Sequence, residues 1–306
     1  MPRRREILFD LIGGQKGGSN GKFFAVEIPL NTVGRVIARC WNSAEDRTSK
    51  VVALRYSGPT EEHITFLFAG ELRASVKKAS SSGEFDRAFM ADLRSSIPDL
   101  DYNAEHIFSG LVARVNFHNR RHEGSQSASD LGIVIRRPVV RLDHNRTYID
   151  LSLDHSTGLL AQAKRGAYNG AAGAFKWGRF TKAQQLLFPK HSNYYSLLLY
   201  RLSGGNADQL EHFRWQLCKN YPYNDIKRWL LSDRFPAEIS SSEVIRRLFA
   251  RKIGTENSEV IRNIIDPKQS GIPIIDLQIL WPDDSTPLLS TQLRQRTRQV
   301  QHVFQR

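Results

Sequence analysis

Four polar residues near the middle of the sequence have the types and the spacing of a metal-dependent site. The short apolar stretch GLLAQAKRG, residues 158–166, carries Gln162 and Lys164. Residues two apart on a strand point to the same side of a sheet, so these two side chains share one face. Upstream, the stretch HEGSQSASDLGIVI contains Glu123 and places Asp130 directly before an apolar run. Oxygen ligands beside a lysine hold a divalent cation next to a phosphate, so the pattern predicts a divalent-metal phosphodiesterase.

These stretches resemble the PD-(D/E)xK nuclease superfamily of restriction endonucleases, Holliday-junction resolvases and defence nucleases. The resemblance covers residues 102–202: SASDLGIVI resembles the metal-binding Asp motif, and LLAQAKRG resembles the variant with Gln in place of the first acid of (D/E)xK. It implies that Asp130 is the central metal ligand, Gln162 the second ligand, Lys164 the catalytic lysine and Glu123 an additional upstream acid. The cofactor implied is Mg²⁺ or Mn²⁺.

The resemblance also implies a function and partners. We expect an endonuclease that hydrolyses phosphodiester bonds of nucleic acid, DNA rather than RNA, in restriction or anti-phage defence. An activating protein such as a helicase or a sensor is an expected partner, and a homo-oligomer stays open. Two alternatives remain: a catalytically inactive nucleic-acid-binding subunit that keeps the nuclease fold, and a structural protein of a ribonucleoprotein or capsid.

The composition agrees with an anionic partner. The chain has 306 residues and a formal net charge of +13, which favours nucleic acid through counterion release at phosphates. Residues 110–180 contain eleven Lys or Arg against five Asp or Glu. No apolar run is long enough for a membrane span and no signal peptide follows the first Met, so we expect a cytoplasmic protein. The two cysteines are far apart and lack metal-site spacing.

The expected fold class is α/β, with three regions along the chain. Residues 1–95 contain β-branched and aromatic runs such as KFFAVEIPL and EHITFLFAGEL, which predict a mainly β N-terminal subdomain. Residues 96–202 are expected to form the nuclease core, which in the family is a restriction-endonuclease-like α-β-β-β-α-β arrangement. Residues 203–306 show helical spacing in NADQLEHFRWQLCKNY and SSSEVIRRLFARKI, and end in a basic tail.

Within the core, the apolar spacing predicts a helix over residues 101–121. Strands are expected at 131–140, 147–153 and 159–164, followed by a helix capped by Thr181 and a buried strand at YYSLLLYRL. Family members often carry a Gln on the helix after the signature, and the resemblance therefore points to Gln184 or Gln185.

A second acid competes with Asp130 for the metal. If HSTG closes a simple hairpin, Asp150 falls opposite Gln162 on the neighbouring strand. A plain three-strand meander also leaves Asp130 several residues from Gln162, unless the register shifts or the chain detours around Pro138. We rank Asp130 first because the motif is more specific than the assumed hairpin register.

Two further interpretations concern the lysine and the stretch after it. A Lys on an edge strand commonly protects against sheet pairing, which is the alternative to a catalytic Lys164. The stretch RGAYNGAAGAFKWGRF mixes small residues, aromatics and the cations Arg165, Lys176 and Arg179. These cations are candidates for contacts with nucleic acid, and a loop with packed aromatics is an equal alternative.

Overall fold

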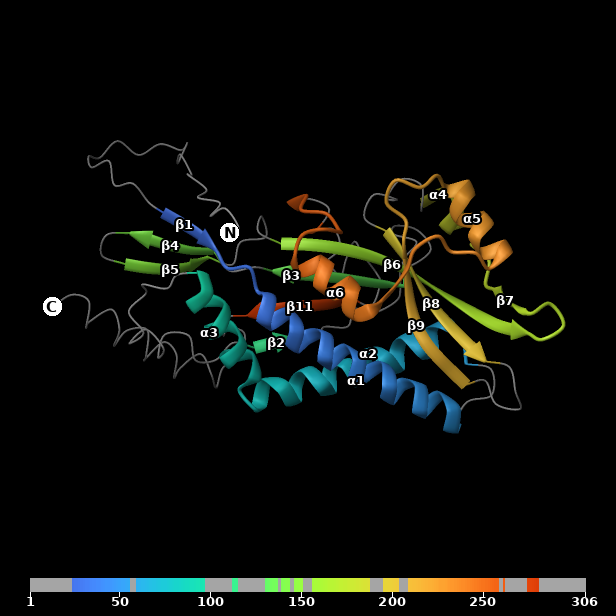
Figure 1. The fold of residues 1–306 in the computed structure, drawn as a ribbon, viewed down its shortest axis with the longest axis horizontal. Helices are drawn as coiled ribbons and strands as arrows, with labels where there is room; N and C mark the ends of the chain where they lie inside the picture. The colour runs from blue at the N-terminus through green and yellow to red at the C-terminus, as the bar shows by residue number, and fades with distance from the viewer. Residues whose placement is uncertain are drawn as a thin grey trace.

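The computed structural model describes most of the chain between residues 24 and 280. The described residues are 24–55, 59–96, 112–114, 130–136, 139–143, 146–150, 156–187, 195–203, 209–258, 261 and 274–280. They form a mixed α/β fold in which helices cover both faces of one large sheet (Figure 1).

The elements alternate irregularly between helices and strands. The helices are α1 Asn31–Arg55, α2 Glu61–Ser81, α3 Glu84–Ser96, α4 Lys182–Leu187, α5 Tyr223–Ser232 and α6 Ser241–Phe249. The strands are β1 Phe24–Glu27, β2 Val112–Arg114, β3 Leu131–Arg136, β4 Val139–Asp143, β5 Arg146–Asp150, β6 Ser156–Asn169, β7 Ala174–Trp177, β8 Tyr195–Ser203, β9 Gln209–Leu217, β10 Glu238–Ser240 and β11 Ile274–Leu280.

The large sheet has eight strands among the described residues. Its order is β10-β9-β8-β6-β3-β11-β2, and β7 forms a hairpin with β6. The pairs β6–β8 and β3–β11 are parallel, while the other pairs are antiparallel. β6 is the longest strand and pairs with β3, β8 and β7, so it lies at the centre of the fold.

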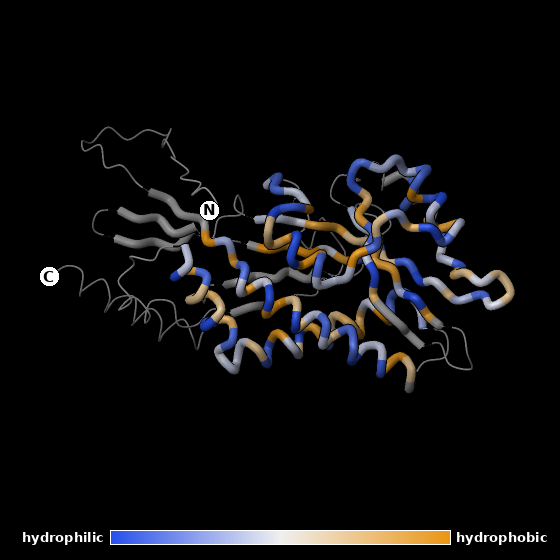
Figure 2. Tube along the Cα trace, viewed as in Figure 1, coloured by the Kyte–Doolittle hydropathy of each residue, from blue (hydrophilic) through white to orange (hydrophobic). Residues whose placement is uncertain are grey.

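Two hydrophobic clusters lie on opposite faces of this sheet. Alternate residues of β6 show the division: Leu159, Ala161 and Ala163 belong to the cluster that α1, α2, α3 and α6 cover, and Leu160 belongs to the cluster under α5. Figure 2 shows the hydrophobic colouring concentrated on the central strands and only in stripes on the helices. Gln162 and Lys164 are therefore on the α5 face, as the two-residue spacing predicted.

A second, three-stranded sheet has the order β1-β4-β5. β4 and β5 follow β3 in the sequence but leave its sheet, and β3 pairs directly with β6. The chain thus changes sheet between Arg136, the end of β3, and Val139, the start of β4. The plain meander, in which β5 would pair with β6, is wrong.

The expected β-rich N-terminal subdomain is also wrong, because residues 31–96 form three helices. The apolar residues of α2 recur at helical steps, as in Ile64, Phe68, Leu72 and Val76, and all are buried. β-branched and aromatic residues favour strands only weakly, and packing against the sheet decides their conformation here.

The C-terminal region is mixed rather than mainly helical. The stretch predicted as a helix around residue 213 is β9, where Phe213 and Trp215 are buried on either side of the half-buried Arg214. This two-residue alternation is the strand pattern. By contrast, the helix predicted at SSSEVIRRLFARKI is α6, and the Ser240 hydroxyl caps it by accepting from the Glu243 amide at 3.3 Å.

Other expectations have mixed outcomes. The strand at YYSLLLYRL is confirmed as β8. The helix predicted over residues 101–121 is contradicted at Val112–Arg114, which is β2; the rest of that stretch, the N-terminal arm and the basic tail lie outside the described residues. Cys40 and Cys218 are both buried and free. None of the described helices has the length and apolarity to cross a membrane.

Candidate functional site

The candidate site lies at a short gap along one edge of β6. The pairing of β6 with β3 ends at Ala161, and its pairing with β7 begins at Gly166, so the edge between them is open. Two carboxylates occupy the open edge: Asp130 Oδ2 accepts from the Ala163 amide at 2.8 Å, and Glu61 Oε1 accepts from the Arg165 amide at 2.9 Å. The carboxylates thus bind alternate N–H groups of β6, which a strand would otherwise have paired.

Asp130 and Gln162 are in direct contact. The Asp130 amide donates to the Ala161 carbonyl at 2.9 Å, which fixes the residue at the start of β3. The Gln162 Nε2 donates to Asp130 Oδ2 and also to the Ala163 carbonyl at 3.2 Å. Both side chains are buried, Gln162 completely. The structure therefore brings together the Asp and the Gln of the sequence motif.

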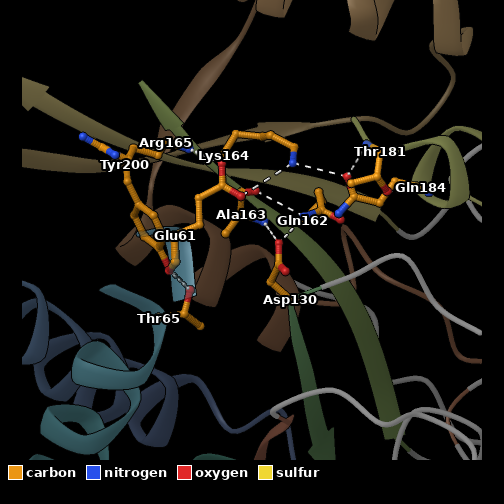
Figure 3. Close-up of polar contacts among 10 residues, drawn as sticks. All are labelled: Glu61, Thr65, Asp130, Gln162, Ala163, Lys164, Arg165, Thr181, Gln184 and Tyr200. Atoms are coloured by element: carbon orange, nitrogen blue, oxygen red, sulfur yellow. Dashed lines mark hydrogen bonds and ion pairs between the residues drawn. The ribbon is translucent and has the colours of Figure 1, made fainter. Parts of the chain in front are cut away.

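Lys164 is buried at the same place, with its side chain only 2% exposed. Its Nζ lies 3.7 Å from Glu61 Oε2 and 3.4 Å from the Gln184 Oε1 (Figure 3). The Phe180 ring centroid is 5.2 Å from the same nitrogen. A lysine that protects a sheet edge must reach solvent, so this burial argues against the edge-protection alternative.

Gln184 is held by a reciprocal pair of hydrogen bonds at the start of α4. The Gln184 amide donates to the Thr181 hydroxyl at 3.2 Å, and the Thr181 amide donates to Gln184 Oε1 at 3.0 Å. This is a capping box, with Thr181 as the predicted cap. The same Gln184 oxygen faces Lys164, so of the two glutamines considered, Gln184 is the one that reaches the site.

Glu61 was missed in the sequence, where residues 1–95 showed no catalytic residues. It is the first residue of α2, next to the cap Thr60, whose hydroxyl accepts from the His63 amide at 3.3 Å. Gly178 leaves room for its carboxylate, because a Cβ there would lie 2.6 Å from Glu61 Oε1. The helix start was readable from Thr60 and the acids after it, but no local signal links residue 61 to a lysine more than a hundred positions away.

Tyr200 lies behind the carboxylates. Its hydroxyl is 2.9 Å from Thr65 Oγ1, and Thr65 Oγ1 donates to the Glu61 carbonyl at 2.8 Å. Burial raises the pKa of Tyr200, and the negative charges of Asp130 and Glu61 raise it further, against the lowering effect of the Thr65 hydrogen bond. The phenol therefore stays neutral and anchors the first turns of α2 to β8.

The donor set suits a hard divalent cation. The Gln162 Oε1 is buried without a hydrogen-bond partner among the described residues, although buried carbonyl oxygens normally have one. This orphaned oxygen and the adjacent Asp130 carboxylate are ligands of the kind that Mg²⁺ and Mn²⁺ prefer. The described residues contain no group of three His, Cys, Asp or Glu that would hold a metal, so any ion here would depend on the amide.

The remaining candidates are placed as follows. Asp150 lies on β5 opposite Val139, in the three-stranded sheet and not beside Gln162. Glu123 lies outside the described residues. Lys176 and Arg179 are exposed, whereas Arg165 is half-buried.

The stretch after Lys164 forms the β6–β7 hairpin. Phe175 and Trp177 pack together with ring centroids 5.9 Å apart, and Trp177 packs on Phe235 at 5.3 Å. Tyr168 and Lys176 remain exposed on the same hairpin. Packed aromatics and exposed cations are thus both present.

No protein-family model, curated protein or solved structure matches this chain. Its function has to be argued from the site itself.

Proposed function

We propose that this protein is a metal-dependent endonuclease of the PD-(D/E)xK type, with a restriction-endonuclease-like core, that hydrolyses phosphodiester bonds in DNA. The observation that carries the proposal is the meeting of Asp130, Gln162 and Lys164 at the open edge of β6. Asp130 is 32 residues from Gln162 in the sequence, and the three residues match the family motif in type. A role in restriction or anti-phage defence follows from the resemblance.

Asp130 and Gln162 would hold the metal ion through the carboxylate and the free amide oxygen. In the structure, Nε2 of Gln162 contacts Asp130, and Oε1 has no partner among the described residues. To bind the ion together with Asp130, the amide would turn so that Oε1 faces the carboxylate. When bound, Mg²⁺ or Mn²⁺ supplies a Lewis acid that polarises the phosphate and lowers the pKa of a coordinated water. Glu61 is a second carboxylate at the site, where it contacts Lys164 and the Arg165 amide. Glu123 remains the additional acid that the resemblance implies.

Lys164 would stabilise the negative charge that develops on the phosphate in the transition state. Its ammonium is already oriented, because Glu61 Oε2 and Gln184 Oε1 contact it from two sides. Such preorganised charges lower a barrier without rearrangement during the reaction. In the reaction, a water oxygen bonds to phosphorus, one ester P–O bond breaks, and the leaving alkoxide gains a proton.

The alternative is a nucleic-acid-binding subunit that has lost catalysis. It is favoured by the neutral Gln162, which leaves the described site with two carboxylates, one of which already pairs with Lys164. Fewer anionic ligands mean weaker metal binding. Both functions predict DNA binding, and only metal-dependent cleavage separates them.

The test is incubation of the full chain with plasmid and circular single-stranded DNA in Mg²⁺, Mn²⁺ or EDTA. We expect metal-dependent cleavage by the wild type and none by Lys164→Ala, with DNA affinity retained. Lys77→Ala is the matched control, since it removes the same charge from the exposed surface of α2. Binding without cleavage in every condition would support the alternative, and equal cleavage by Lys164→Ala would refute the site.

A further inference from the structure

A basic surface adjoins the candidate site and contains two elements that pack together. We call it the hairpin–helix surface: the β6–β7 hairpin with Arg179 and Lys182, and the outer face of α5. Asp233, which ends α5, accepts from the Phe175 amide at 2.9 Å and from the Trp177 Nε1 at 2.7 Å. The helix end is therefore fixed to β7, and the two elements form one surface.

The outer face of α5 is defined by helical spacing. Asn224, Lys227, Arg228 and Leu231 are exposed at steps of three and four residues, while Ile226 and Leu230 on the other side are buried. Leu231 is 66% exposed. This face therefore presents an amide, two cations and an aliphatic side chain to the solvent.

The charge of the hairpin–helix surface is strongly positive. Residues 165–182 contain four basic residues and no acidic one. Residues 219–234 contain four basic and two acidic residues, and one of these acids, Asp233, already accepts two hydrogen bonds. The other, Asp225, lies 3.5 Å from Arg228, whose side chain is 75% exposed, so this pair offsets little of the surface potential.

Apolar side chains are exposed on the same surface. Of the four exposed large hydrophobic residues in the described part of the chain, Tyr168, Tyr221 and Leu231 lie on or beside it. The hairpin projects beyond α5 at one end of the molecule, and its tip is hydrophobic (Figures 1 and 2). Exposed apolar groups commonly mark a binding surface. Next to cations, they suit nucleic acid, in which the cations contact phosphates and the other side chains contact base edges.

The surface is linked to the candidate site through packed side chains. Tyr223, the first residue of α5, packs on Phe180 with ring centroids 5.5 Å apart, and the Phe180 ring centroid is 5.2 Å from Lys164 Nζ. Two side chains thus connect the helix to the lysine. A ligand bound on α5 would therefore lie next to the elements that hold Lys164.

The geometry points to duplex DNA as the ligand: we propose that α5 enters the major groove and that the hairpin contacts the adjacent backbone. A ten-residue helix is about 15 Å long, and the major groove of B-DNA, about 12 Å wide, admits a helix. The major groove of duplex RNA is too narrow for one. Single strands favour stacking on exposed rings. The exposed rings of this surface, Tyr168 and Tyr221, lie beside α5, and none of the four outer residues of α5 itself is aromatic. That duplex DNA is the substrate rests on the proposed nuclease function. That duplex DNA binds to α5 does not depend on it.

The test measures the salt dependence of binding by fluorescence anisotropy in EDTA, with a labelled duplex and a single strand of the same length. The variant is Lys227→Ala combined with Arg228→Ala. We expect the slope of log affinity against log salt to fall by about 0.9 for each phosphate that the variant no longer neutralises, and duplex affinity at low salt to fall about tenfold or more. Arg73→Ala combined with Lys77→Ala, on the opposite face of the sheet, should retain the wild-type slope.

Each other outcome counts against the inference. An unchanged duplex slope in the α5 variant overturns it. So does single-strand binding that equals duplex binding and falls equally in the variant, and so does binding only to vesicles of anionic phospholipid. Cleavage is measured separately. Duplex binding that depends on α5, without metal-dependent cleavage, refutes the nuclease and leaves this inference standing. Metal-dependent cleavage that does not depend on α5 refutes this inference and leaves the nuclease standing.

Discussion

Replacing Gln162 by Glu tests whether this side chain faces a metal ion. The substitution restores the commoner signature, but it puts a second carboxylate against Asp130, with which Gln162 now shares a hydrogen bond in a buried site. Two like charges about 4 Å apart at an effective dielectric constant of 20 repel by about 4 kcal/mol. The ammonium of Lys164 and a shared proton offset part of this. We therefore expect Gln162→Glu to lose about 2–4 kcal/mol of folding stability at pH 8 without metal.

The pH dependence has a definite sign. Repulsion and burial raise the pKa of the introduced carboxyl above its unfolded value, so the folded state binds its proton more tightly. Stability is then unaffected below the unfolded pKa and falls as pH rises towards the raised value. At pH 8 in EDTA, the loss corresponds to a Tm about 4–8 °C below that of the wild type. Mn²⁺ should restore most of it, because a carboxylate binds the ion more tightly than an amide.

Gln216→Glu is the matched control. Gln216 is also fully buried on a strand, where its amide donates to the Leu217 carbonyl at 2.8 Å and accepts from the Ala237 amide at 3.2 Å. This variant should be destabilised equally in EDTA and in Mn²⁺. If Gln162→Glu shows the same metal-independent deficit in thermal melts, Gln162 does not bind the ion and the assignment fails.

Three further tests address separate parts of the structure. Asp130→Asn should abolish cleavage while keeping the fold, since an amide oxygen still accepts from the Ala163 amide. Asp150→Asn, in the three-stranded sheet, should keep most of the activity. The reverse result in a plasmid-nicking assay would show that the wrong acid was chosen. Asp92→Ala should lower the free energy of unfolding in urea by about 2–3 kcal/mol. The reason is that the Asp92 carboxylate accepts from the Thr32 and Val33 amides at 2.8–3.0 Å at the start of α1. Asp46→Ala, at an exposed position, should lower it little. Burial raises the pKa of Glu45 to about 7, against hydrogen bonds from Ser241 and Trp41, so its contribution to stability declines as pH rises through that value. Glu45→Gln should therefore be about 2–3 kcal/mol more stable than the wild type at pH 8 and no more stable at pH 5, and a pH-independent difference in unfolding free energy would contradict the buried carboxyl.

The sequence predicted the part of the site that is local in the chain. Asp130 lies one residue before a strand and Gln162 and Lys164 lie two apart on another, so the motif and the two-residue period were sufficient to propose them. Glu61 was out of reach, because α2 brings it to β6 only through packing that no local pattern encodes.

The errors in the fold have a common physical origin. Helix α1 and helix α2 are rich in β-branched and aromatic residues, and their packing in the core, not their propensity, makes them helical. Strand β9 carries residues that also fit a helix, and its pairing with β8 decides the outcome. The pairing of β3 with β6 depends on a detour of the chain that a single sequence only allows and does not specify.

The two carboxylates at the open edge of β6 have a consequence for how such a site changes over generations. Asp130 and Glu61 accept hydrogen bonds from strand amides, so each is held by selection for an intact sheet as well as by selection for chemistry. Under the proposed nuclease function, a descendant that lost cleavage through Lys164 would still be penalised for losing either acid. If that function holds, the residue at position 164 should distinguish active relatives from inactive ones better than the two acids do.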